Sequence, residues 1–213
     1  ATVNITITST GTDQSVIWTD LVGVTASGNT ITKTASTAWG NGGAASTQAI
    51  PADGGVSFVA TQTNTYRMCG LSNTNPDANW NTIRYDLYLR ADRVITVYES
   101  GAYRGNFGSY NLNDIFSVER VGSTVYYKKN NATFYTSTVA STGSLIVDAA
   151  LYDNGAIIAN AMIIGGGTGP ANNPPVLGSI GNRTIQAGNN LTFQVTASDP
   201  DGDALTYSAS NFP

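Results

Sequence analysis

The chain has 213 residues, of which 41% are hydrophobic but only 11% are charged, and its formal net charge is −4. Ten Lys and Arg residues are too few to build the basic surface that nucleic-acid phosphates require, and no apolar run is long enough to span a membrane, so we expect neither nucleic-acid binding nor membrane insertion. The absence of His and the single Cys exclude a Ser-His-Asp triad, a His/Cys zinc centre and an intrachain disulfide.

Short segments of alternating apolar and polar residues recur along the chain, and each is bounded by Gly, Asn, Asp or Ser. This pattern is typical of an all-β sandwich or barrel, and no long segment keeps the apolar period of a helix. The predicted strands of the first part are 3–8, 16–24, 31–34, 56–61, 66–71, 83–89, 94–98, 115–121, 125–127, 133–136, 145–151 and 157–164.

The predicted strand 83–89 has two different faces. Tyr85 and Leu87 point to one face, whereas Asp86 and Tyr88 point to the other, because side chains alternate along a strand. The strand therefore has one packed face and one polar, aromatic-bearing face. Surface ion pairs of little energetic weight are expected among the charged residues of this region, Arg84, Arg90, Arg93, Asp86 and Asp92.

Two turns and two core residues are also predicted. Residues 91–92 join two strands in a tight hairpin, and Asn130 and Asn131 join two more, since Asn adopts the positive φ that a two-residue turn needs. Trp18 and Cys69 lie in apolar segments, so we expect both side chains in the core.

The composition changes sharply after the strand 157–164. Residues 167–175 are rich in Gly, Pro and Asn, which predicts a linker that separates two domains. Strands are expected again at 176–180, 184–186, 191–197 and 205–208, but residues 176–213 are too few to cover both faces of a sandwich. Either this second domain is truncated or another chain supplies its missing strands.

Residues 125–137, followed by 145–148 and the strand 157–164, resemble the late hairpin of concanavalin A-like jelly rolls, a superfamily that includes laminin G-like and SPRY-like modules. Residues 56–60 and 67–72 are similar to the paired core strands of that group. The resemblance implies an antiparallel jelly-roll β-sandwich over residues 1–166, which in many relatives binds glycans or proteins.

Residues 173–176, 185–188 and 193–207 resemble the first half of a bacterial cadherin-like or Ig-like surface repeat. The resemblance implies that residues 176–213 form a partial β-domain of a secreted or cell-surface bacterial multidomain protein. Its acidic turn places Asp199, Asp201 and Asp203 at alternate positions, which can present several hard oxygen ligands to Ca²⁺. The alternative is a polar turn whose charges face water.

Two aromatic segments are candidate ligand sites. Trp80 follows Asn79 in a polar loop with no apolar period to bury it, and an aromatic ring beside amides is suited to stacking on a sugar. The segment with Tyr103, Arg104 and Tyr110 offers a second group of the same kind. Alternatively, Trp80 closes one end of the sandwich and the tyrosines pack over a sheet edge. Trp39 is expected to be a core or core-lid residue.

The sequence favours a non-catalytic binding module for a polysaccharide or other glycan, in an adhesin or beside a polysaccharide-degrading enzyme. The chain has only Glu99 and Glu119 as glutamates, on different predicted strands, so the carboxyl pair of a retaining glycosidase is not expected. The alternative is a structural segment of an adhesin or filament, which associates with other copies of itself by strand exchange.

Overall fold

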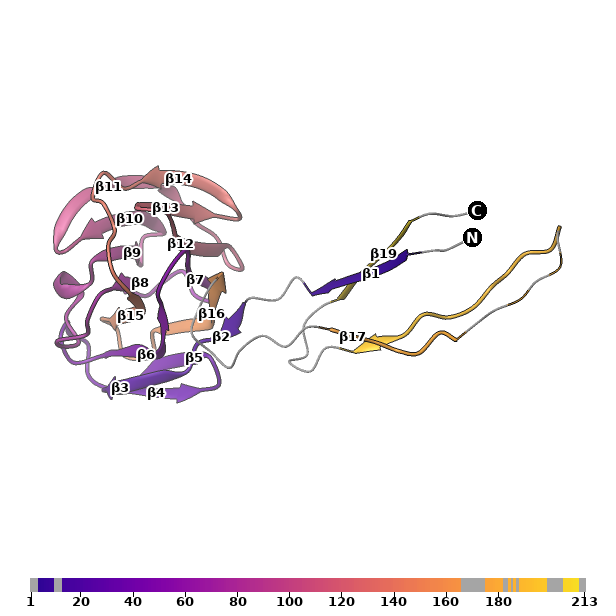
Figure 1. Ribbon diagram of the computed structural model, residues 1–213. Coiled ribbons are helices and arrows are strands. Elements are labelled where there is room, and N and C mark those ends of the chain that lie inside the picture. The colour runs from indigo at the N-terminus through magenta and orange to yellow at the C-terminus, as the bar shows by residue number, and fades with distance from the viewer. Residues whose placement is uncertain are drawn as a thin grey trace. The chain divides into compact units, whose positions relative to one another are not determined.

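The computed structural model describes residues 4–9, 13–165, 175–181, 184, 186, 188–198 and 205–210 (Figure 1). Contacts divide the chain into one unit of residues 13–169 and a second unit that combines residues 1–12 with 170–213. The predicted calcium ligands, Asp199, Asp201 and Asp203, and residues 167–174 of the predicted linker lie outside the described residues.

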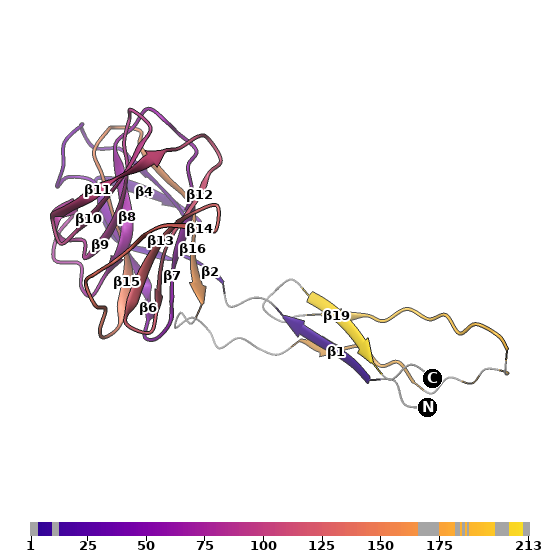
Figure 2. The ribbon, with the colours of Figure 1, turned by 90° about the horizontal axis from the view of Figure 1, so that it is seen from above.

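The first unit is a sandwich of two sheets, in which the paired strands of the described residues run antiparallel (Figure 2). In spatial order, the seven-stranded sheet consists of β11 (Ala102–Ser109), β10 (Val94–Glu99), β9 (Tyr85–Leu89), β8 (Arg67–Ser72), β15 (Leu145–Leu151), β6 (Gly43–Ile50) and β3 (Trp18–Val22). The eight-stranded sheet consists of β14 (Ala132–Thr136), β13 (Thr124–Lys129), β12 (Ile115–Val121), β7 (Gly54–Val59), β16 (Ile157–Gly165), β5 (Thr30–Lys33) and β4 (Val24–Ser27), with β2 (Gln14–Ser15) also paired to β16.

The chain crosses repeatedly between the two sheets. Strand β6 lies in the seven-stranded sheet and β7 in the other, and the chain then returns to the first sheet for β8 to β11. Strands β12 to β14 belong to the second sheet, β15 to the first and β16 to the second. This is the antiparallel jelly-roll sandwich that the sequence predicts.

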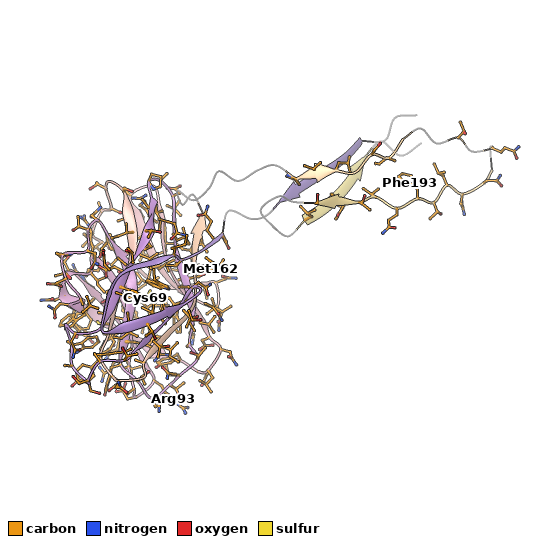
Figure 3. All side chains as sticks on the ribbon, turned by 90° about the horizontal axis from the view of Figure 1, so that it is seen from below. Cys69, Arg93, Met162 and Phe193 are labelled. Carbon is orange, nitrogen blue, oxygen red and sulfur yellow. The ribbon has the colours of Figure 1, made fainter. Side chains whose placement is uncertain are left out.

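The core lies between the sheets and is built from alternate residues of the strands. Leu87 and Leu89 of β9 and Phe116 and Val118 of β12 are fully buried there. Trp18 and Cys69 are buried as predicted, and Cys69 lies among the strands of the sandwich (Figure 3). Burial and the nearby acids Asp86 and Asp148 raise the pKa of the Cys69 thiol, so it remains a protonated core side chain.

Both predicted hairpins are present. Asn130 and Asn131 connect β13 to β14 with φ of 49° and 66°, as a two-residue turn of twisted strands requires. The connection from β9 to β10 is one residue longer on each side than the predicted pair 91–92, and the Arg93 amide donates to the Arg90 carbonyl (3.0 Å).

Two strands of the seven-stranded sheet lack a sequence signal. Strand β6 consists mainly of Gly, Ala, Ser and Thr, yet it is paired on both sides, by β15 and β3. Strand β11 contains Gly105 and Gly108, both with positive φ, which interrupt the alternation. Neighbouring strands, rather than local side-chain preference, define these two elements.

In the second unit, β1 (Asn4–Ser9) pairs with β19 (Leu205–Ser210), and β17 (Val176–Leu177) pairs with β18 (Ala197–Ser198). Residues 1–12 therefore group with the C-terminal residues, whereas the sequence analysis assigned them to the sandwich. The strand predicted at 191–197 is wrong for residues 191–196, which form no strand. In the described part of the chain, no helix is long and apolar enough to cross a membrane.

Candidate functional site

The outward face of the seven-stranded sheet carries an unusual number of aromatic rings. Tyr88 of β9 and Tyr98 of β10 point away from the core, because their neighbours Leu87 and Val97 are buried inside it. The two strands are paired so that Asp86 lies opposite Tyr98 and Thr96 lies opposite Tyr88. The sheet register thus brings both tyrosines to the same surface.

These rings belong to a connected group that we call the aromatic band. Six of its members are half-buried, and Tyr103 is 56% exposed. Neighbouring ring centroids are between 4.9 and 6.4 Å apart. Strands β9, β10 and β11 contribute three of the rings, and the segments flanking the strands contribute the others. The band consists of Trp39, Tyr66, Trp80, Tyr88, Tyr98, Tyr103 and Tyr152.

The band is a stepped surface rather than one flat platform. Trp80 and Tyr98 have centroids 4.9 Å apart and planes 68° apart, and Tyr98 and Tyr103 have centroids 5.6 Å apart and planes 60° apart. Such tilted pairs are favourable aromatic contacts. Burial raises the pKa of the Tyr88 hydroxyl, which therefore remains a neutral donor. The surface combines partly exposed ring carbons with neutral hydroxyls.

A short 3-10 helix, η1 (Trp80–Thr82), holds Trp80 in the loop between β8 and β9. The Asp77 carboxylate accepts hydrogen bonds from the Asn79 amide (2.8 Å) and the Thr82 hydroxyl (3.1 Å). The amide of Asn79 is the main cause that lowers the pKa of Asp77. An ionised Asp77 thus fixes the turn from which Trp80 projects.

Lys33, at the end of β5, fixes the loop that carries Trp39, the second tryptophan of the aromatic band. Its buried ammonium group donates to the carbonyls of Ala38 (2.5 Å), Leu151 (2.8 Å) and Tyr152 (2.7 Å) and to Asn41 Oδ1 (2.7 Å). Burial lowers the pKa of this ammonium group. The contacts join the loop with Trp39 to the end of β15, where the rings of Trp39 and Tyr152 are 5.2 Å apart.

Two carboxyl groups on the band's side of the sheet are buried. In the strand register, Asp86 of β9 and Asp148 of β15 lie on either side of Gly70 of β8. Asp86 is 0% exposed and Asp148 is 2% exposed. Ser72 donates to Asp148 (2.8 Å), but neither oxygen of Asp86 has a hydrogen-bond partner of ordinary geometry among the described residues. The predicted surface pairing of Asp86 is therefore wrong, although Arg90 and Asp92 do form an ion pair (2.8 Å).

Burial raises the pKa of both carboxyl groups, that of Asp148 to about 7. The charge of Asp148 raises the pKa of Asp86 further, and the Leu87 amide offsets only part of this. Paired carboxyls can serve as a catalytic acid and base, but only if they reach the substrate. Because neither side chain is open to solvent, this pair offers no such contact in the structure.

The structure separates the predicted site residues into two groups. Trp80 and Tyr103 both belong to the aromatic band, and the Asn79 side chain lies against Gly40, next to Trp39. Arg104 follows Tyr103 in β11 and its guanidinium instead meets the buried carboxylate of Glu99 (2.8 Å). Adjacent strand residues face opposite sides, which explains why Tyr103 and Arg104 do not share a surface.

Tyr110 is 0% exposed and belongs to the core. Its hydroxyl donates to the Arg90 carbonyl (2.7 Å), and its ring packs 6.0 Å from that of Phe116. Tyr110 therefore cannot contact a ligand at the surface. The prediction that it is a ligand-binding residue is wrong, because its side chain is part of the core.

Sequence reasoning missed most of the band. It placed Trp39 in or over the core, and it did not name Tyr66, Tyr98 or Tyr152. The aromatic-bearing face predicted from Asp86 and Tyr88 was the available signal for β9. The convergence of three strands and four connecting segments on that face comes from the sheet order.

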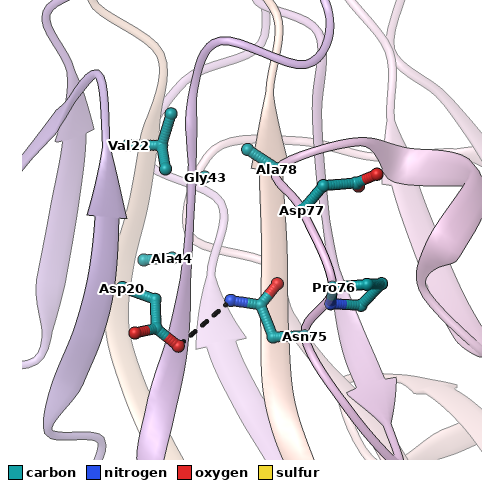
Figure 4. Close-up of a pocket in the computed structure, with 8 residues that line it drawn as sticks. All are labelled: Asp20, Val22, Gly43, Ala44, Asn75, Pro76, Asp77 and Ala78. Atoms are coloured by element: carbon teal, nitrogen blue, oxygen red, sulfur yellow. Dashed lines mark hydrogen bonds between the residues drawn. The ribbon is translucent and has the colours of Figure 1, made fainter.

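A small recess lies beside the band's loops (Figure 4). Its volume is about 290 Å³, and β3, β6 and the loop between β8 and β9 form its walls. Asn75 Nδ2 lies 3.4 Å from a carboxylate oxygen of Asp20 across the recess. The residues that line it are Asp20, Val22, Gly43, Ala44, Asn75, Pro76, Asp77 and Ala78.

No family model matches the sequence, and no curated protein has a significantly similar sequence. Similar solved structures include the SPRY domain of human HERC1, with 13% identity and a TM-score of 0.47, covering 71% of this chain and 92% of that one. The β-glucanase of Bacillus licheniformis has 9% identity and a TM-score of 0.41, covering 75% of this chain and 97% of its own.

The CBM2 module of an evolved Dit protein from Lactobacillus casei BL23 phage J-1 is also similar, with 10% identity and a TM-score of 0.40. It covers 75% of this chain and 96% of that chain. At these identities and TM-scores, the similar structures identify neither a ligand nor a reaction for this chain. The sheets and side chains of the chain itself define the fold and the site.

Proposed function

We propose that the chain is a non-catalytic carbohydrate-binding module that holds a neutral glycan across the aromatic band. One observation carries this proposal: seven partly exposed rings gather on one sheet face, where a soluble fold would otherwise place polar side chains. Aromatic rings stack on the apolar faces of sugars, and the tyrosine hydroxyls and neighbouring amides can bond the sugar hydroxyls.

The charges around the band favour a neutral ligand. Arg90 is paired with Asp92, and Arg104 faces away from the band and is paired with Glu99. An anionic glycan on the band therefore gains little from either guanidinium group. The stepped arrangement of the rings suits a chain of sugars, because successive sugar rings can turn about their glycosidic bonds.

The non-catalytic assignment is supported by the positions of the acids. Asp86 and Asp148 are buried on the band's side of their sheet, and Glu119 is paired with Lys128 on the other sheet. A retaining glycosidase needs two carboxyl groups about 5 Å apart on either side of an accessible sugar bond. None of these acids offers that arrangement to a ligand on the band.

The setting we propose is extracellular, in a bacterial multidomain protein. The similarity of residues 173–207 to bacterial surface repeats supports it. The same similarity supports a calcium site formed by the acidic turn, Asp199, Asp201 and Asp203. We expect calcium to raise the melting temperature of the second unit, and a melting curve that a chelator leaves unchanged would exclude this site.

Self-association is a second candidate function, because the second unit leaves apolar side chains exposed. Val176 and Leu177 of β17 are 57% and 40% exposed, and Tyr207 of β19 is 49% exposed. Pairing with another copy would cover such surfaces. Light scattering of the full chain and of a chain without residues 176–213 tests this; self-association predicts oligomers that disappear on deletion.

Affinity electrophoresis in gels that contain neutral polysaccharides tests the glycan proposal. We expect at least one polysaccharide to retard the protein, and Trp80→Ala and Tyr103→Ala each to abolish most of the retardation. Tyr126→Ala is the matched control, since Tyr126 is a half-buried tyrosine on β13 of the other sheet. If the band variants migrate like the wild type in every gel, the band is not the binding site.

A further inference from the structure

Strand β3, at the edge of the seven-stranded sheet, contains a β-bulge beside the recess. Thr19 pairs with Ala45 and Val22 pairs with Gly43, so that two residues of β3 lie opposite the single residue Ala44 of β6. One of the two is Asp20, whose φ is +51°, in the left-handed region that favours glycine. A bulge bends the strand and redirects a side chain, and bulges are frequent next to binding sites.

The bulge turns the Asp20 carboxylate across the recess toward Asn75, whereas the Asp77 side chain points away from Asp20 (Figure 4). Asp20 accepts only a long hydrogen bond of 3.4 Å from Asn75. The Asn79 backbone amide and the Thr82 hydroxyl both donate to the Oδ1 atom of Asp77. Neither acid forms an ion pair among the described residues, which leaves carboxylate lone pairs to accept hydrogen bonds from a ligand.

The remaining walls of the recess are small and apolar. One side of the recess is formed by Gly43, Ala44 and Ala78. The backbone is closely packed there, because a Cβ atom on Gly43 would lie 3.1 Å from the Cβ of Ala78 and 2.7 Å from the Ala149 carbonyl oxygen. At about 290 Å³ the recess is at the lower limit of small-molecule pockets. It has room for one small ring, which would make apolar contacts on one side and donate hydrogen bonds from its hydroxyls to acceptors on the other.

The segments that carry the two tryptophans of the band are continuous with two walls of the recess. The loop between β8 and β9 supplies Asn75 and Asp77 to the recess and Trp80 to the band. The loop with Trp39 enters β6 at Gly43. A glycan that lies on the band can therefore reach the recess with one end.

Building on the glycan binding proposed above, we propose that this recess is a separate subsite that takes one neutral terminal sugar, whose hydroxyls donate to Asp20 and Asn75. None of the eight described lining residues is cationic, so a sugar acid is repelled by the two carboxylates. The bulge at Asp20 positions the carboxylate that accepts hydrogen bonds from this sugar. Because the recess has room for one sugar only, the subsite prefers the end of a glycan chain.

The variant Asp20→Gly separates binding from folding. Glycine adopts a positive φ without steric cost, so the variant should melt no lower than the wild type while it lacks the carboxylate. Loss of a hydrogen bond to a charged group weakens binding about tenfold to a hundredfold. Asp20→Asn keeps the backbone conformation and one acceptor, so we expect it to lose less.

The experiment follows the backbone amide signals of Gly43 and Ala44 by NMR while glucose, galactose, mannose or N-acetylglucosamine is added. At least one of these sugars should shift both signals saturably in the wild type, and Asp20→Gly should weaken that binding about tenfold to a hundredfold. Glucuronate should not shift them. No shift with any neutral sugar, unchanged binding by Asp20→Gly, or equal binding of glucuronate would each overturn the subsite.

A neutral oligosaccharide series in the same samples distinguishes failure of the subsite from failure of the glycan proposal. If the indole signals of Trp39 and Trp80 respond to an oligosaccharide while Gly43 and Ala44 do not, the band binds glycan but the recess takes no sugar. If neither set responds to any sugar, both proposals are wrong.

Discussion

Asp148→Asn should make the protein more stable at neutral pH, although it changes a buried hydrogen-bonded side chain. The Asp148 carboxyl is 2% exposed and its pKa is about 7 in the folded protein, against 3.8 for an exposed Asp. The Ser72 hydroxyl donates a hydrogen bond to it at 2.8 Å. No described cation approaches it to compensate its charge.

The size and sign of the effect follow from the two pKa values. Each unit of difference in pKa corresponds to about 1.4 kcal/mol, so a carboxyl that titrates at about 7 instead of 3.8 changes the free energy of unfolding by about 4 kcal/mol. Between these values the folded state holds the proton and the unfolded state does not. The contribution of Asp148 is therefore most favourable below pH 4 and is lost as the pH rises to 7.

Urea unfolding of the wild type and of Asp148→Asn from pH 4 to pH 8 measures this effect. The chain has no His to titrate in this range, and the raised pKa of Asp86 acts in the same direction. We expect wild-type stability to fall by several kcal/mol as the pH rises. The variant should lose only the part that Asp148 contributes, about 4 kcal/mol, and should keep the part that Asp86 contributes. Asp92→Asn, at an exposed ion pair, is the control and should change stability by less than about 1 kcal/mol. Wild-type stability that is constant or rises over this range would refute the reasoning.

Three further predictions concern the framework of the site. Lys33→Met should lower the free energy of unfolding by about 3 kcal/mol or more in urea titrations, because four acceptors in buried or partly buried hydrogen bonds lose their donor. Lys128→Met, at a partly exposed ion pair, should lower it by less than about 1 kcal/mol. Gly70→Ala should lower the free energy of unfolding by more than about 4 kcal/mol, since the new Cβ would clash with the Tyr85 carbonyl oxygen. Gly122→Ala, whose Cβ would lie in open space at a positive φ, is the control and should lower it by about 1 kcal/mol. Residues 13–165 alone should give a cooperative thermal transition, because both sheets and the core lie within them; absence of that transition would show that the second unit is needed.

The alternation of apolar residues predicted the sandwich well, because most of its strands bury one face. Strands 115–121 and 145–151 have the predicted bounds, since each contains large apolar residues at regular positions. Strand β6 could not be found in this way, because its Gly and Ala residues carry little signal and its neighbours define it.

The site was less predictable than the fold, because it depends on which strands lie side by side. Trp80 and Tyr103 were named from their local context, and both belong to the band. Arg104 and Tyr110 were grouped with them by nearness in sequence, but strand alternation and core packing separate them. The buried position of Asp86 also depends on tertiary structure, since strand alternation places its side chain on the outward face of β9, which only other segments of the fold can cover.

The central claim is that the aromatic band binds a neutral glycan, and the three tryptophans of the chain allow a direct test. An NMR titration with neutral oligosaccharides would follow all three indole signals, with Trp18, which is buried in the core, as the internal reference. The account predicts saturable shifts at Trp39 and Trp80 and none at Trp18 for at least one oligosaccharide. No response at Trp39 and Trp80 across neutral glycans, or equal shifts at all three indoles, would contradict it.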